Sequence, residues 1–135
     1  MSDPTTRASG VIDGAPYATH ITAGRHALTA DEPSSAGGAD AGPSPFALVL
    51  SGLIACTAIT LRMYADRKAW PVKRVAVDAV YHHAKDASFI ERVLHIEGDL
   101  DDEQRARMAD IAERTPVTLA LKSASDIRTR LEASV

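Results

Sequence analysis

The chain has 135 residues, enough for one domain with a buried core, and a formal net charge of −3 from 15 basic and 18 acidic residues. Because the basic residues are scattered among acidic ones, we expect no nucleic-acid partner and no acidic membrane partner. The single cysteine excludes an intramolecular disulfide. Residues 1–14 contain no apolar run, so no secretory signal is predicted and we expect a cytoplasmic protein.

The first part of the chain predicts a tail followed by a hairpin. Residues 1–16 are rich in Ser, Thr, Gly, Asp and Pro, which predicts a mobile N-terminal tail, and residues 17–135 are expected to form a single domain. Side chains alternate over residues 17–23, which predicts a strand. Residues 25–30 are its expected antiparallel partner, with the turn at Gly24.

A long apolar helix is predicted after a loop over residues 31–45. Ser44 suits the N-cap and Pro45 the first helical position, and the helix is expected to reach about Lys68, before Pro71. Its uncharged stretch of 16 residues is shorter than the roughly 20 that span a bilayer, so we expect no membrane segment. The helix is apolar on nearly every side and should be surrounded by protein. One copy has few elements to cover it, which predicts a homodimer.

Beyond the helix the apolar pattern changes to a period of two. Residues 73–81 and 90–96 predict an antiparallel hairpin, with a connector at 85–88. The adjacent His82 and His83 point to opposite faces of a strand and cannot chelate one metal together. No histidine pair has metal-ligand spacing, so no metal site is expected.

The C-terminal part predicts a helix, a short turn and a strand. Asp101 and Gln104 resemble a capping box, and the helix that they open is expected to reach Arg114. Its inward positions are Met108, Ile111 and Ala112. Residues 117–121 predict a further helical turn and residues 127–131 a last strand. Hairpin, helix, hairpin, helix and strand in this order indicate an α+β fold.

Cys56 is the residue with the most distinctive chemistry. It lies about three turns inside the long helix, with Gly52 one turn before it and Thr60 one turn after. The helix dipole is too far away to activate the thiol, and no cation lies within a turn of it on the helix. Two interpretations remain open, a small structural core residue or a nucleophile activated by a cation from another segment. Arg25, just past the predicted turn, is the candidate cation.

Short segments between about residues 17 and 131 form a pattern that supports a family comparison. They are Gly24-Arg25-His26, Ala30-Asp31-Glu32-Pro33, Gly37-Gly38-Ala39-Asp40, Gly42-Pro43-Ser44-Pro45, Ala55-Cys56-Thr57-Ala58, Thr60-Leu61-Arg62-Met63-Tyr64-Ala65, Lys68, Gly98-Asp99-Leu100 and Ile111-Ala112-Glu113-Arg114-Thr115-Pro116-Val117. This pattern resembles the OsmC/Ohr family (osmotically induced and organic-hydroperoxide-resistance proteins). The resemblance implies an OsmC-like α+β fold, with antiparallel sheets, a long buried central helix and an intertwined homodimer.

The resemblance also assigns roles to single residues. Well-known members reduce organic hydroperoxides with two cysteines, an arginine that keeps the first cysteine ionised and a glutamate that orients the arginine. Cys56 matches the first cysteine, and Arg25 is the candidate arginine. Phe46 stands where the glutamate would be, and Thr115 stands where the second cysteine would be. A two-cysteine cycle within one chain is therefore impossible.

Two functions follow as hypotheses. The first is a one-cysteine thiol peroxidase that acts on small apolar hydroperoxides and is reduced by an external thiol, without a cofactor. The alternative is a non-catalytic protein that binds a hydrophobic, lipid-like ligand at the dimer interface. We favour the first because the resemblance is strongest around Cys56. The expected pocket residues are Phe46, Leu50, Gly52, Leu53, Thr60 and Thr115.

Overall fold

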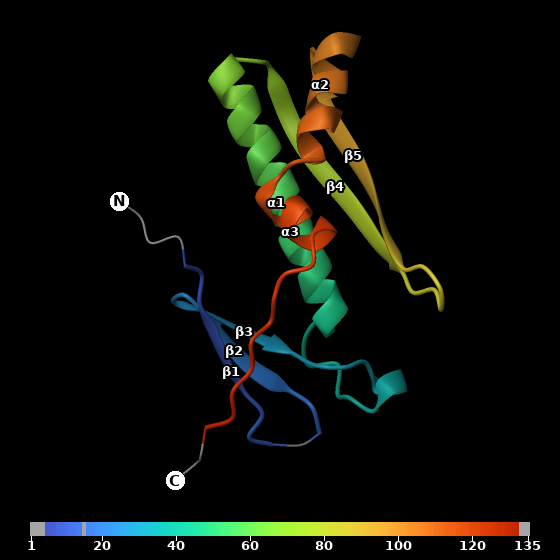
Figure 1. Ribbon diagram of the computed structural model, residues 1–135. Helices are drawn as coiled ribbons and strands as arrows, with labels where there is room; N and C mark the ends of the chain where they lie inside the picture. The colour runs from blue at the N-terminus through green and yellow to red at the C-terminus, as the bar shows by residue number, and fades with distance from the viewer. Residues whose placement is uncertain (1–4, 15, 133–135) are drawn as a thin grey trace. The chain divides into compact units, whose positions relative to one another are not determined.

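The computed structural model describes residues 5–14 and 16–132. The chain divides into two compact units, Met1–Ser51 and Gly52–Val135. The strands are β1 (Ala8–Val11), β2 (Thr19–Ala23), β3 (His26–Ala30), β4 (Val72–His82) and β5 (Phe89–Gly98), and the helices are η1 (Ser34–Ala36), α1 (Pro45–Lys68), α2 (Asp102–Ala112) and α3 (Pro116–Lys122) (Figure 1). This content confirms the predicted α+β class with antiparallel sheets.

The first unit is built on a three-stranded antiparallel sheet in the order β1-β2-β3. The predicted hairpin is confirmed: Ala23 pairs with His26, and Gly24 has the positive φ (61°) that a tight turn demands. Residues 8–11 differ from the expected mobile tail, because they form β1, which pairs with β2 along its length. Backbone hydrogen bonds to a sheet edge can order a segment whose side chains are too small and polar to form a core.

The loop between β3 and α1 is organised by Asp31. This side chain is almost fully buried, and its carboxylate accepts hydrogen bonds from the backbone N–H groups of Glu32 (2.7 Å), Ala39 (3.2 Å) and Ala41 (3.0 Å). The Ala41 amide, together with those of Glu32 and Ala39, holds the pKa of the Asp31 carboxyl below its ordinary value. Asp31 thus holds together the loop that leads into α1.

In the second unit, β4 and β5 form an antiparallel pair, and α1 and α2 pack beside it (Figure 1). The capping box of α2 is confirmed, since Asp101 and Gln104 each accept from the other's backbone N–H. The buried core consists of Leu61, Ala65, Val72 and Met108. Residues of α1, β4 and α2 therefore meet in one cluster.

Two predictions for the C-terminal part need correction. The helix α2 ends at Ala112 rather than Arg114, and α3 begins at Pro116, which fits the first turn of a helix because it lacks an N–H donor. Residues 127–131 do not form the expected last strand. Ile127 and Leu131 are 86% and 98% exposed, and no strand of the described residues pairs with this segment to hold it extended.

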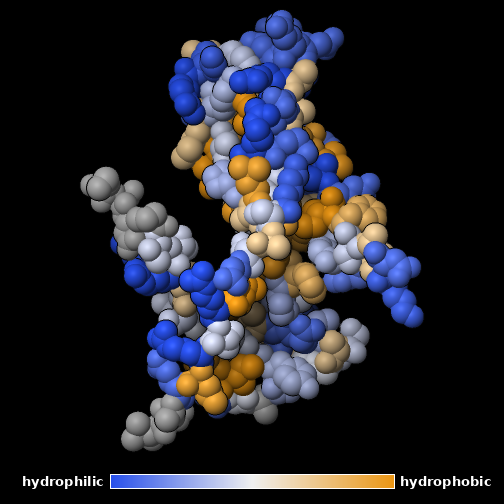
Figure 2. Space-filling view, in the orientation of Figure 1, coloured by the Kyte–Doolittle hydropathy of each residue, from blue (hydrophilic) through white to orange (hydrophobic). Residues whose placement is uncertain are grey.

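Among the residues that the structure describes, the buried positions of the long helix α1 lie along one side of it. In the second unit its buried residues are Leu53, Thr57, Leu61 and Ala65, spaced four apart. Gly52, Ala55, Ile59 and Met63 are exposed on α1. By length and hydropathy alone the helix could also cross a membrane, but its buried side packs into the core of the second unit. Figure 2 shows hydrophobic residues interspersed with hydrophilic ones on the face in view.

Candidate functional site

The thiol of Cys56 is half-buried and faces one backbone donor. The N–H of Val117, in the first turn of α3, lies 3.5 Å from Cys56 Sγ and donates a hydrogen bond to it. This is an ordinary length for a bond to sulfur, which is larger than oxygen. Cys56 is therefore a partly exposed residue whose sulfur accepts a hydrogen bond from the backbone of α3.

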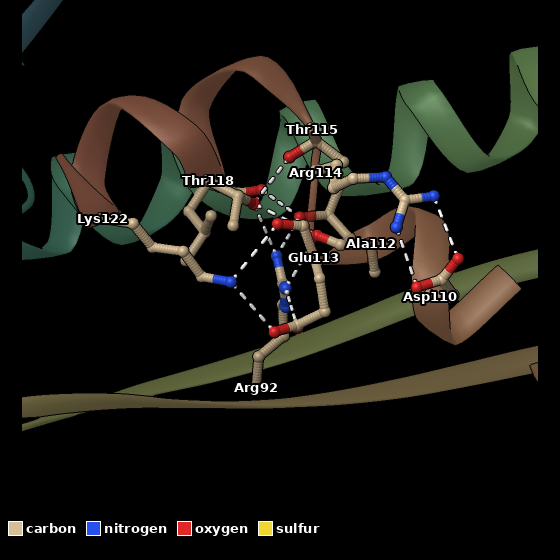
Figure 3. A network of polar contacts seen from close by, with 10 residues as sticks. Arg92, Asp110, Ala112, Glu113, Arg114, Thr115, Thr118 and Lys122 are labelled. Atoms are coloured by element: carbon tan, nitrogen blue, oxygen red, sulfur yellow. Dashed lines mark hydrogen bonds and ion pairs between the residues drawn. The ribbon is translucent and has the colours of Figure 1, made fainter.

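Next to this contact, Arg92 brings a cation into the second unit (Figure 3). Its side chain is only 11% exposed and comes from the inward-facing side of β5. The guanidinium donates to Thr57 Oγ1 (3.0 Å), Thr118 Oγ1 (2.9 Å), the Ala112 carbonyl (2.8 Å) and Glu113 Oε2 (3.0 Å). A buried guanidinium is stable only when most of its donors are paired, and here four of its five N–H groups have acceptors.

Three buried threonines continue this network. Thr57, Thr115 and Thr118 are each no more than 5% exposed. The hydroxyl oxygens of Thr115 and Thr118 lie 2.6 Å apart, and the Thr57 hydroxyl donates to the Leu53 carbonyl at 2.7 Å. Thr118 also reaches the Ala112 carbonyl at 3.3 Å. The polar groups inside this region are therefore paired with one another.

Glu113 closes the network on its exposed side. Lys122 Nζ lies 3.0 Å from Glu113 Oε1, and Arg92 binds the other carboxylate oxygen. The Lys122 hydrogen bond, followed by the one from Arg92, lowers the pKa of the Glu113 carboxyl from its ordinary value. Glu113 therefore favours its ionised form and offsets part of the positive charge of Arg92 and Lys122.

The residues expected to form the site are divided between the two compact units. Arg25 belongs to the β2–β3 turn of the first unit, and Phe46 and Leu50 belong to its part of α1. Cys56 and the remaining expected pocket residues lie in the second unit. Of those, Gly52 is exposed, Thr60 half-buried, and Leu53 and Thr115 are buried. The structure links Cys56 to the α3 region through Val117.

Sequence reasoning missed Arg92. Its signal was present, because Arg92 interrupts the alternating apolar face of Ile90, Leu94 and Ile96, and a charged residue on a core-facing position needs buried partners. Thr57 and Thr118 gave no such signal, because a threonine in a helix can satisfy its hydroxyl on a carbonyl of the preceding turn without taking part in any site. Among the described residues, no group of three or more metal-binding side chains is placed to hold an ion.

Comparisons with known proteins agree with this architecture. The family model described as OsmC-like protein matches residues 37–130. No curated protein sequence matches the chain significantly. An OsmC-like protein from Mycoplasma pneumoniae superposes with a TM-score of 0.76 at 19% identity, covering 91% of each chain.

Two further solved structures bear names that state a role. An organic hydroperoxide resistance protein from Legionella pneumophila gives a TM-score of 0.66 at 20% identity and covers 90% of this chain and 92% of its own. One from Vibrio cholerae, with captopril bound in one of its active sites, gives 0.66 at 20% identity and covers 92% and 89%. At such identity these structures establish the fold alone.

Proposed function

The chain belongs to the OsmC-like family, and on that premise we propose that it is a thiol-dependent hydroperoxide reductase with Cys56 as its single reactive cysteine. The observation that carries the proposal is the half-buried residue Cys56, whose sulfur accepts a hydrogen bond from the Val117 N–H. Several structural neighbours are named organic hydroperoxide resistance proteins, which supports the same chemistry. The fold supplies the scaffold, and the sulfur supplies the nucleophile.

The reaction takes place in three steps. The Cys56 thiolate attacks the outer oxygen of an organic hydroperoxide, the O–O bond breaks, and the alkoxide takes up a proton and leaves as an alcohol. Cys56 is thereby oxidised to a sulfenic acid. An external thiol then forms a mixed disulfide with Cys56 and releases water. A second external thiol attacks the external sulfur of that disulfide, so the two external thiols leave joined as a disulfide and Cys56 is released in its reduced form.

The external thiol is required because Thr115 stands where a second cysteine would act. Its hydroxyl is bound to Thr118, and an alcohol cannot form a disulfide. Small thiols and redoxins keep cytosolic proteins reduced, so we place this reaction in the cytoplasm. Arg25 remains our candidate for the cation that keeps the sulfur ionised, on the strength of the family resemblance.

We also propose that the protein acts as a homodimer. In one copy Ala55, Ile59 and Met63 leave an apolar side of α1 exposed to water, with Ile59 53% and Met63 62% exposed. Contiguous exposed apolar surface of this kind is typical of an interface. A second copy of the same helix offers a matching apolar surface, as a two-fold symmetric interface requires.

The experiment follows peroxide consumption by the purified protein. Cumene hydroperoxide is supplied with a monothiol as the reductant, and the sulfenic acid is trapped with dimedone and located by mass spectrometry. We expect turnover that depends on the thiol, and a dimedone adduct on Cys56 alone. Cys56→Ser should remove both, while Asp66→Asn, at an exposed position in the last turns of the same helix, should remove neither. Consumption by Cys56→Ser equal to that of the wild type would refute the proposal.

The alternative function is binding of a hydrophobic ligand without catalysis. The observation that favours it is the exposed apolar side chain of Phe46 (49% exposed) near the start of α1. Under this alternative, lipid co-purifies with the native protein and is lost in Phe46→Asp, and no dimedone adduct forms. The presence or absence of a dimedone adduct on Cys56 after exposure to peroxide thus distinguishes the two functions.

A further inference from the structure

One nitrogen of Arg92 binds the residue that follows Cys56 and the residue that follows Val117. Nη1 donates to the hydroxyls of Thr57 and Thr118, at 3.0 and 2.9 Å. Thr57 follows Cys56 in α1, and Thr118 follows Val117 in α3. The two helices are therefore tied together by the same nitrogen, one residue away from the sulfur and one residue away from its donor.

We propose that Arg92 is a positioning residue that keeps the Val117 N–H on the Cys56 sulfur. An N–H···S bond depends steeply on distance and angle, so the two helices must hold a fixed separation. The other nitrogen of Arg92, Nη2, binds the Ala112 carbonyl and Glu113 and so anchors the guanidinium to the end of α2. Rigid support of this kind is what a reactive side chain needs in order to stay in place.

The charged groups around this support are few among the described contacts. They are Arg92 from β5, Glu113 after α2, Lys122 at the end of α3, and Asp110 and Arg114, which pair with each other at 2.8 Å beside Glu113 (Figure 3). Glu113 neutralises charge at the exposed edge, whereas the guanidinium is the cation whose bonds reach the residue beside Cys56. Removing Arg92 therefore takes away both the alignment of the donor and the buried positive charge.

The test is the rate at which iodoacetamide alkylates Cys56, measured from about pH 5 to about pH 9. A hydrogen bond to a charged acceptor changes an equilibrium by about tenfold, so Arg92→Met should lower the rate near pH 7 by about tenfold and move the profile to higher pH. Arg92→Lys, which keeps the charge, should recover part of the rate. Arg74→Met removes an exposed arginine from β4, paired with Glu97 at 3.4 Å, and should leave the profile unchanged.

A second pair of variants keeps the test decisive if Arg92→Met does not fold. Thr118→Val removes the hydroxyl that Arg92 binds and should move the profile in the same direction, and Thr118→Ser should restore it. Profiles of all folded variants that coincide with the wild type, even with lowered melting temperatures, would overturn the proposal. The catalytic meaning of this role rests on the proposed function, but alkylation needs no peroxide. An altered profile without peroxide turnover would therefore refute the enzyme and leave the positioning role intact.

Discussion

Replacing Leu61 and replacing Met63 by alanine should have different consequences, although both residues lie on α1. Leu61 is fully buried in the core of its own unit, whereas Met63 is 62% exposed. We expect Leu61→Ala to lower the free energy of unfolding without changing the association of two copies. We expect Met63→Ala to weaken that association, because its side chain lies on the side of α1 that the proposed homodimer covers.

The magnitudes follow from burial. Truncating a fully buried leucine removes its transfer free energy and leaves a cavity, which together cost about 3 to 4 kcal/mol. Met63 has lost only part of its contact with water, so its truncation in a single copy costs about 1 kcal/mol. Complete burial of the Met63 side chain against a second copy adds roughly another 1 kcal/mol per subunit to the free energy of dimerisation, and Met63→Ala removes it. Counted twice in a symmetric dimer, this raises the dissociation constant by at least about tenfold.

The assays are urea unfolding and sedimentation velocity over a range of protein concentrations. Leu61→Ala should shift the unfolding midpoint strongly, and Met63→Ala should shift the population from dimer to monomer on dilution. Two results would contradict the reasoning. A loss below about 1 kcal/mol for Leu61→Ala would mean that the core is assigned wrongly. A wild-type chain that is monomeric at every concentration would eliminate the homodimer.

Three further outcomes are expected. Asp31→Asn should speed hydrogen exchange of the Ala41 amide, because an amide side chain accepts more weakly than a carboxylate; unchanged exchange would show that the loop is held by other contacts. Thr115→Cys should form a disulfide with Cys56 on treatment with hydroperoxide, detected as the loss of both thiols, whereas a persistent sulfenic acid would show that residue 115 does not reach the sulfur. The pKa of the Glu113 carboxyl is lower in the folded state than its usual value of 4.5. The ionised carboxylate therefore stabilises the fold at pH values above 4.5, and this stabilisation is lost as the pH falls through the pKa of the folded state. The stability difference between wild type and Glu113→Gln should accordingly shrink on acidification, and a difference that grows would reverse the sign of this argument.

The elements that were predicted correctly are those encoded by neighbouring residues. Gly24 gives a turn because it adopts a positive φ, and Asp101 with Gln104 caps α2 through bonds that span three residues. The prediction of a strand at residues 127–131 was wrong because a strand depends on a partner that is distant in the sequence. An apolar alternation becomes a strand only when another strand supplies hydrogen bonds, and no local pattern reports whether that partner exists.

The sequence by itself determined that the chain carries a single thiol, Cys56, within a long apolar helix. Only the tertiary structure decided what surrounds that thiol. Arg92 lies 35 residues from Thr57 and 26 from Thr118 along the chain, and its guanidinium meets them because β5 and the helices pack together. Local propensities act over a few residues, whereas a buried charge is placed by the packing of all the elements around it.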